Sequence, residues 1–286
     1  MERKRLLAVA ALLALLLGFW ILAGRLSREQ EERQMTITAM SVGKADALIV
    51  ETADCAVLID AGEEDDGEKI VSELRDRGVE RLDLMVVTHF DKDHVGGAAQ
   101  VLEEIGAETV LMPDYEGDRP EYGAFLRALE GHEDARRVSG EDELTLGGME
   151  FTVYGAGDSL PAADPGEEDD NDRSLVISLR YGESGFLFTG DVEEARIAQM
   201  LDSGTDWAHD WIKMPHHGRY KENLPELLEA VKPSWAVICC SEKHPAQEET
   251  LALLEAEGIP VWDTSEGAVT TVCDGSSIEV FPAGQR

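Results

Sequence analysis

The chain has 286 residues, and its 59 acidic and 25 basic side chains give a formal net charge of −34 with histidine neutral. Binding of nucleic acid or anionic lipid across a general surface depends on Lys and Arg replacing counterions, so this charge excludes such a protein. Hydrophobic residues make up 43% of the chain and occur in periodic blocks, which excludes disorder of the whole chain. We therefore expect a folded, acidic body of one large or two small domains.

The first feature along the chain is an apolar segment. Residues 6–24 carry no charge and follow the basic cluster Arg3–Arg5, and about 20 apolar residues are what a helix needs to cross a bilayer. A lipoprotein signal is excluded because no Cys lies near the end of the segment. A cleaved signal peptide is disfavoured, because Leu22 or Ile21 would stand where the peptidase requires a small residue.

The alternative that remains is an uncleaved, single-pass membrane anchor. We predict this anchor over residues 1–24, a linker over 25–34 and a single folded domain over 35–286. The basic cluster precedes the anchor, so the positive-inside rule leaves the body outside the cytoplasm. Without residues 1–24 the chain has 22 basic and 58 acidic side chains and a net charge of −36.

The body alternates between strand and helix patterns. In chain order we predict strands at 35–40, 45–51 and 56–60, a helix at 69–77, a strand at 82–88, a helix at 97–105, a strand at 109–112, a helix at 121–129, strands at 144–154, 174–181 and 186–189, a helix at 192–201, a strand at 211–214, a helix at 224–231, a strand at 235–240, a helix at 248–257, and a strand at 260–262 with two more ending near 281. The strands fall into two groups, each followed by helices. The economical architecture is an α/β domain of two sheets packed face to face with helices on both outer sides.

The most informative segment follows the apolar strand predicted at 82–88. Within six residues it holds His89, Asp91, Asp93 and His94, ahead of two glycines that let the backbone turn tightly. In an extended or looping chain alternate side chains share a side, so His89, Asp91 and Asp93 can converge, and His94 adds a fourth ligand. The alternative is a strand end that is merely polar, but carboxylates and imidazoles crowded against a buried strand would be costly without a cation. Such ligands suit zinc, manganese or iron.

Further histidines and one aspartate follow other strand ends. The adjacent pair His216 and His217 is not incidental, although one of the two can serve only to orient the other ligands. Asp191 lies just past an apolar strand, where an unpaired acid would be costly and a carboxylate that bridges two ions would not. We expect His132 and His209 at the surface.

Several short segments stand in an order typical of a known family. They are Ser41–Ala47, Leu58–Gly62, His89–His94, Asn171–Leu175, Thr189–Asp191, Pro215–Gly218 and His244–Pro245. Together they resemble the metallo-β-lactamase-fold hydrolases, and within them the soluble domain of ComEC-type competence proteins. The third segment is similar to the HxHxDH metal motif, with Asp91 in place of the second histidine. The resemblance covers nearly the whole body.

The resemblance implies a four-layer αββα fold with two divalent ions between the sheets. It assigns the metal ligands as His89 and Asp91 for one ion, Asp93 and His94 for the other, Asp191 between them, and His216 or His217 to complete the second site. The residues expected to orient these ligands or to face the substrate are Asp46, Asp60, Asn171, Asp172 and Ser174.

Two departures from the family pattern bear on the metals. Lys44-Ala45 replaces the more usual Gln-Gly, and no histidine stands in the third motif. There, Asn171 or Asp172 must serve as a ligand or leave one ion weakly held. The resemblance favours zinc, but an oxygen-rich first site makes manganese a competitor.

The resemblance also implies an activity, the hydrolysis of phosphodiester bonds by a metal-bridging hydroxide, with Asp93 and His244 in catalytic roles. The expected partners are the membrane, through the anchor, and a phosphodiester in DNA or a cell-wall polymer, and no strong protein partner is expected. Lys92 and Arg173 either neutralise a phosphate or lie at the surface. Charge argues against a close copy of a DNA-cleaving relative, because the acidic body repels a polyanion over a Debye length of about 8 to 10 Å. The alternatives are a phosphocholine esterase, a lactone or thioester hydrolase on the same fold, and a non-catalytic, membrane-tethered binding protein.

Overall fold

The computed structural model describes residues 34–157, residue 160 and residues 170–284. The predicted anchor, and all of the predicted linker except Gln34, lie outside this part of the chain. Within the described ranges, none of the helices has both the length and the apolar character needed to span a bilayer.

The first sheet has eight strands and joins the two ends of the body. Its order across the sheet is β15 (Ile278–Pro282), β14 (Val269–Cys273), β1 (Met35–Ala39), β2 (Leu48–Thr52), β3 (Cys55–Ile59), β4 (Leu82–Val86), β5 (Ala107–Pro113) and β6 (Ala135–Val138). The pairs from β15 to β3 are antiparallel, and those from β3 to β6 are parallel.

The second sheet has seven strands and a similar division. Its order is β13 (Val261–Asp263), β12 (Trp235–Ile238), β11 (Trp211–Lys213), β10 (Ser184–Phe188), β9 (Val176–Tyr181), β8 (Met149–Tyr154) and β7 (Glu141–Leu146). The pairs from β7 to β10 are antiparallel, and those from β10 to β13 are parallel.

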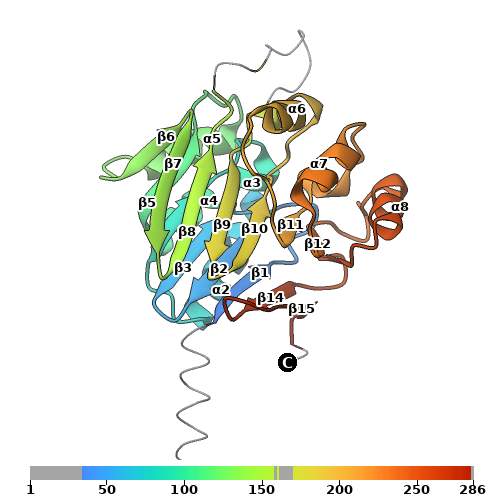
Figure 1. Cartoon of the computed structure of the whole chain (residues 1–286). Helices are drawn as coiled ribbons and strands as arrows, with labels where there is room; N and C mark the ends of the chain where they lie inside the picture. Colours follow the sequence, from blue (N-terminus) through green and yellow to red (C-terminus); the bar gives the residue numbers. More distant parts are fainter. Residues whose placement is uncertain (1–33, 158–159, 161–169, 285–286) are drawn as a thin grey trace, which may run out of the picture.

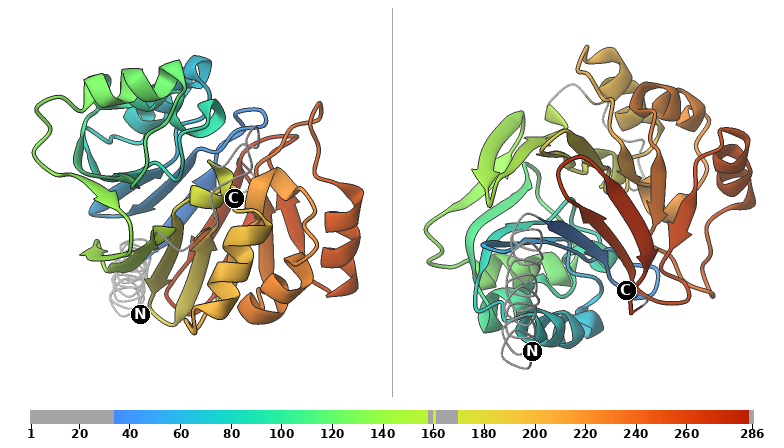
Figure 2. Two further views of the ribbon diagram at one scale, coloured as in Figure 1. Left: turned by 90° about the horizontal axis from the view of Figure 1, so that it is seen from above. Right: turned by 60° about the horizontal axis from the view of Figure 1, so that its bottom comes forward.

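The two sheets pack face to face, and helices cover their outer sides (Figure 1). Apolar side chains from both inner faces, such as Val57, Phe151 and Phe186, form the central core. The helices α2 (Gly67–Asp76), α4 (Ala98–Glu104) and α5 (Pro120–Ala128) pack on the first sheet, and α6 (Glu194–Asp202), α7 (Leu224–Val231) and α8 (Glu248–Ala256) pack on the second. Seen from above, these two groups lie on opposite sides of the paired sheets (Figure 2). The predicted αββα sandwich is confirmed.

The fold brings polar loops to one place because both sheets contain parallel strands. The carboxyl ends of parallel neighbours meet at the same sheet edge. Asp60 follows β3, and the segment from Thr88 to His94 follows β4 in the first sheet. In the second sheet, Asp191 follows β10 and the turn η4 (Pro215–Gly218) follows β11.

Three local features differ from the sequence prediction. The stretch 144–154 is a hairpin, β7 and β8, whose turn residues Gly147 and Gly148 have positive φ angles of 56° and 78°. The edge strand β6 was not predicted, because its sequence ARRV lacks apolar alternation. The segment His89–His94, called the ligand segment below, was expected to be extended or looping. Part of it forms the short helix α3 (Lys92–Val95).

Candidate metal centre

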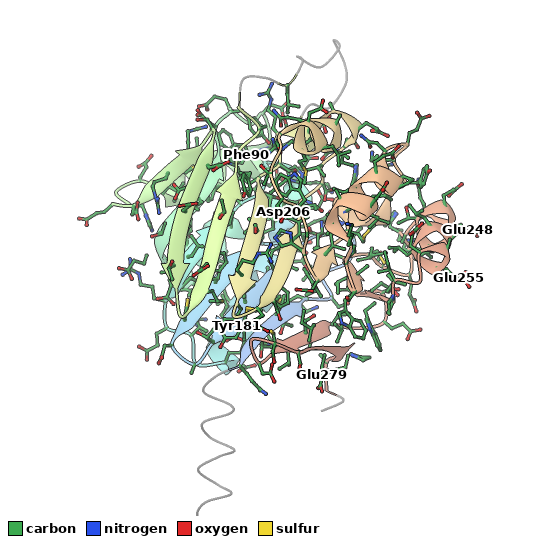
Figure 3. The ribbon with its side chains drawn as sticks, viewed as in Figure 1. Phe90, Tyr181, Asp206, Glu248, Glu255 and Glu279 are labelled. Carbon is green, nitrogen blue, oxygen red and sulfur yellow. The ribbon has the colours of Figure 1, made fainter. Side chains whose placement is uncertain are left out.

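The ligand segment is anchored beneath its polar side chains by Asp60. This carboxylate accepts hydrogen bonds from the Thr88 backbone N–H (2.7 Å), the Thr88 hydroxyl (2.8 Å) and His94 Nδ1 (2.8 Å). Phe90, labelled in Figure 3, packs its ring against those of Tyr115 and Tyr122 and so fastens the loop to the α5 side. Asp60 has a φ of 59°, a conformation that is unfavourable for most side chains and is found where function demands it.

Four predicted ligands converge at this edge. His217 Nε2 lies 3.1 Å from Asp191 Oδ2 and 3.5 Å from Asp93 Oδ2. His94 Nε2 lies 3.3 Å from Asp191 Oδ1. The Nε2 atoms of His94 and His217 are buried and have no hydrogen-bond partner, although both face carboxylates. Buried polar atoms are normally satisfied, so this arrangement fits a cation held between them.

The opposite ring nitrogens of these histidines are held by the protein. His94 Nδ1 donates to Asp60, and His217 Nδ1 donates to the Cys239 carbonyl oxygen at 3.0 Å. A proton fixed on Nδ1 leaves the Nε2 lone pair to bind a metal. Asp191 is positioned by its backbone N–H, which donates to the Ser174 hydroxyl at 3.2 Å. Ser174 thus holds the loop that carries Asp191.

Asp46 and Lys213 lie behind the two histidines. Asp46 Oδ1 is 3.4 Å from His217 Nδ1, and its Oδ2 is 3.9 Å from His94 Nδ1. The buried Lys213 ammonium forms an ion pair with Asp46 and donates to the Gly190 carbonyl oxygen (2.8 Å) and to Asp191 Oδ1 (3.3 Å). Ligand atoms of Asp46, His94, Asp191 and His217 all lie within 4.8 Å of one another. Asp46 faces the Nδ1 side and a lysine, so it orients the imidazoles and is poorly placed to bind an ion.

Sequence reasoning did not single out Lys213. The signal was present, because a lysine stands inside the apolar stretch Trp211–Met214. A lysine is almost never fully buried unless it is paired, and this one is about 1% exposed. A buried lysine in a strand next to two histidines therefore indicates a carboxylate partner.

The residues predicted to bind the first ion lie slightly farther apart than those predicted for the second. His89 Nε2 is buried without a hydrogen-bond partner and lies 3.8 Å from Asp91 Oδ2. Its Nδ1 is 3.1 Å from the Thr88 hydroxyl, which itself donates to Asp60. The rings of His89 and His94 have centroids 4.0 Å apart, so the two predicted ion positions are neighbours.

The structure separates the two candidates for the missing third-motif ligand. Asn171 is buried, and its side-chain oxygen has no hydrogen-bond partner. Asp172 Oδ1 accepts from the backbone N–H groups of Glu193 (2.9 Å) and Arg196 (3.0 Å). Asp172 therefore caps the first turn of α6, whereas the buried amide oxygen of Asn171 is left without a hydrogen-bond partner.

His216 and His217 occupy different environments, although they are adjacent. Both adopt left-handed backbone conformations, with φ angles of 44° and 53°, in a turn that follows β11. His217 points into the ligand cluster, as described above. His216 donates from Nδ1 to Glu193 Oε1 at 2.8 Å, and its Nε2 lies 3.9 Å from Asp191 Oδ2. Glu193 also accepts from Lys221.

His244 lies apart from these contacts. It stands in an exposed turn after β12, where its backbone pairs with Ser241. No hydrogen bond or ion pair joins its side chain to the cluster in the described residues. The expectation for His209 was wrong, because its ring is buried and contacts Ser178 Oγ (2.7 Å) and the Trp207 carbonyl oxygen (2.8 Å).

Electrostatics across the cluster favour cation binding. Burial alone disfavours every charged form here, and at His217, His94, Asp191 and Asp93 neighbouring opposite charges outweigh it. Burial opposes and Asp191 supports the charged form of His217, whose pKa is raised to about 10. The pKa values of Asp191 and Asp93 are held below their ordinary range, because His217 and His94 offset the effect of burial. Burial and His94 lower the pKa of His89, which leaves it neutral. An ion would replace the protons on the paired histidines.

The two-sheet sandwich and the buried imidazole and carboxylate cluster at its edge define a metallo-hydrolase. A family model described as the metallo-beta-lactamase superfamily matches residues 40–242. The chain belongs to this superfamily.

Competence proteins are among its curated relatives. The chain is 26% identical over 205 residues to ComE operon protein 3 of Bacillus subtilis, and the alignment covers 70% of this chain and 26% of that protein. It is 28% identical over 259 residues to competence protein ComA of Neisseria gonorrhoeae, and the alignment covers 84% of this chain and 34% of that protein. The chain thus spans about a quarter to a third of the length of these relatives.

Solved structures show the same fold at low identity. Igni18, a metallo hydrolase from Ignicoccus hospitalis, aligns with a TM-score of 0.53 and 15% identity, over 86% of this chain and 98% of that chain. The metallo-beta-lactamase fold protein YhfI from Bacillus subtilis aligns with a TM-score of 0.51 and 11% identity, over 87% of this chain and 99% of that chain.

Proposed function

We propose that this chain is a metal-dependent phosphodiesterase that acts outside the cytoplasm. The observation that carries the proposal is the convergence of Asp93, His94, Asp191 and His217 with unsatisfied imidazole nitrogens facing carboxylates. Similarity to competence proteins supports a phosphodiester substrate, since those proteins are named for a process that takes up DNA.

The chain offers ligands for two ions. Asp93, His94 and His217 would hold one, and His89, Asp91 and Asn171 would hold the other, with Asp191 between them. Two such divalent ions supply a hydroxide near neutral pH and stabilise charge on the substrate oxygens. Asp60, Asp46 and Lys213 hold the imidazoles in orientation. We propose zinc as the resident metal, with manganese competing at the oxygen-rich first position.

Roles for Asp93 and His244 follow different lines. Asp93 Oδ2 lies 3.5 Å from His217 Nε2. As a metal ligand at that position, Asp93 would also lie next to the attacking hydroxide. His244 would reach a leaving group only if its exposed turn folds over the bound substrate, so it is proposed as a proton donor in the complex.

The substrate within the phosphodiester class is narrowed by charge. The net charge of −36 outside residues 1–24 disfavours a long polyanion spread over the surface. Binding of a single phosphodiester group at the two metal ions is compatible with that charge. This observation favours a second candidate, an esterase that acts on a phosphodiester of a cell-wall polymer such as one carrying phosphocholine. The membrane anchor that the sequence predicts over residues 1–24 would keep either enzyme at the membrane surface.

The test is a panel of substrates for the purified full chain with zinc or manganese. The panel contains bis-p-nitrophenyl phosphate, single- and double-stranded DNA, p-nitrophenyl phosphocholine, a lactone and a thioester. We expect phosphodiester hydrolysis that is lost in Asp191→Ala and in Asp93→Ala. Cleavage of the lactone or thioester alone would refute the phosphodiesterase, and retained hydrolysis in a variant that has lost its metal would refute the mechanism.

A further inference from the structure

Two solvent-reachable cations from different loops contact the ligand segment. Lys44, in the loop between β1 and β2, has its Nζ 3.2 Å from Asp93 Oδ2. Arg119, just before α5, has Nη2 3.6 Å from Asp91 Oδ1. The side chains of Lys44 and Arg119 are 34% and 40% exposed, against 13% and 16% for the two aspartates.

Other cations near the site have different partners. Lys213 is buried against Asp46, and Lys221 pairs with Glu193. Lys92 lies in the ligand segment itself but pairs with Glu63 at 2.8 Å. Lys44 and Arg119 combine exposure with direct contact to carboxylates that the proposed ions need.

Asp91 and Asp93 cannot fully serve both as ion-pair partners of these cations and as metal ligands. An ion bound by Asp91 and Asp93 takes up their negative charge and repels a nearby ammonium or guanidinium group. Ion pairs whose cation is open to solvent are weak, typically below about 1 kcal/mol, so Lys44 and Arg119 lose little when they move away. Long side chains of this kind can then turn toward an anion at the same opening. A lysine supplies a point charge, and an arginine supplies a planar fork that matches phosphate oxygens.

We propose that Lys44 and Arg119 form an anion clamp that metal binding releases. In the metal-free chain they pair with Asp93 and Asp91. In the metal-loaded chain they would turn from these aspartates and bind the two non-bridging oxygens of a phosphodiester. The inference rests on the proposed function, because it assumes an anionic phosphodiester as the substrate.

The clamp has a signature that a structural role lacks. Removing either cation relieves competition for an aspartate, so metal affinity stays the same or rises. The same change removes a contact to the anion, so anion affinity falls. Loss of folding or of the site would lower both affinities, so it cannot imitate a fall in anion affinity without a fall in metal affinity.

The experiment measures two dissociation constants by calorimetry on the full chain, one for Mn²⁺ and one for inorganic phosphate on the Mn²⁺-loaded protein. We expect Lys44→Gln and Arg119→Gln each to weaken phosphate binding by about threefold to tenfold with Mn²⁺ binding unchanged or tighter. Lys44→Arg should restore most of the phosphate affinity. Lys92→Gln is the matched control, and both of its constants should equal those of the unmodified chain.

The proposal is overturned if phosphate affinity is unchanged in both Gln variants. It is also overturned if Mn²⁺ binding weakens together with phosphate binding, because the residues would then support the site and not the anion. Failure of the proposed function is a separate result. Phosphate binding that depends on the clamp, in a protein that hydrolyses none of the phosphodiesters, would leave the clamp standing and contradict the phosphodiesterase.

Discussion

Lys213 and Asp46 form an ion pair between the two sheets, with each side chain about 1% exposed. Lys213 ends β11 of the second sheet, and Asp46 lies in the loop between β1 and β2 of the first. The pair contacts the back of His217 and the Asp191 carboxylate. It therefore couples the packing of the sandwich to the geometry of the metal centre.

Breaking this pair should destabilise the protein. Removing one partner of a buried pair leaves an uncompensated charge and costs about 3–5 kcal/mol. We expect that loss of unfolding free energy in Lys213→Met, measured by urea denaturation of the metal-free protein. The double variant Lys213→Met with Asp46→Leu should lose less than the sum of the two single variants. Additive losses would show that the two residues do not act as a pair.

The adjacent histidines should differ in their effect on metal binding. His217 faces Asp93 and Asp191, whereas His216 is tied to Glu193. Residues that only orient ligands typically contribute about 10–100-fold in metal affinity. We expect His217→Ala to exceed that range and His216→Ala to stay within or below it, by competition with a fluorescent zinc chelator. The reverse order would exchange their roles.

Asn171 and Asp172 should separate metal binding from stability. Asn171→Ala removes the unsatisfied oxygen, so metal analysis should show reduced occupancy of one of two ions at unchanged fold. Asp172→Ala removes a cap of α6 and should cost about 1 kcal/mol of stability at unchanged metal content. If Asp172→Ala instead lost an ion, Asp172 and not Asn171 would be the metal ligand.

Metal binding should release protons at neutral pH. Burial lowers and Asp191 raises the pKa of His217, with a net value of about 10, so the metal-free ring is protonated at pH 7.5. An ion that takes its Nε2 must displace that proton, and affinity should rise about tenfold per pH unit for each proton released. Calorimetry in two buffers of different ionisation enthalpy counts these protons. Heats that do not depend on the buffer would contradict the prediction.

His209 should make the fold sensitive to acid independently of the metals. Burial lowers the pKa of this imidazole, so the unfolded chain takes up a proton at higher pH than the folded chain does. The contribution is complete above the ordinary value of about 6.5 and is lost as the pH falls below it. We expect His209→Asn to lose less stability than the unmodified chain between pH 7.5 and 5.5 in urea denaturation. Equal losses would rule out His209 as the cause.

Local patterns in the sequence were sufficient to predict the layers of the fold and most of the residues that gather at the candidate metal centre. Strand and helix periodicity predicted the αββα sandwich, because each amphipathic element must bury one face. The crowding of four potential ligands into His89–His94 indicated a metal site, because that much charge beside a buried strand needs a counterion.

What local patterns could not predict depends on which distant groups the fold brings together. Asn171 and Asp172 are chemically similar neighbours, and the approach of α6 turns Asp172 into a cap. His216 and His217 are identical residues, and the left-handed turn after β11 sends one into the cluster and the other to Glu193. The partner of Lys213 comes from the opposite sheet, 167 residues earlier in the chain. Backbone direction and long-range pairing arise from sheet packing, which a short stretch of sequence does not encode.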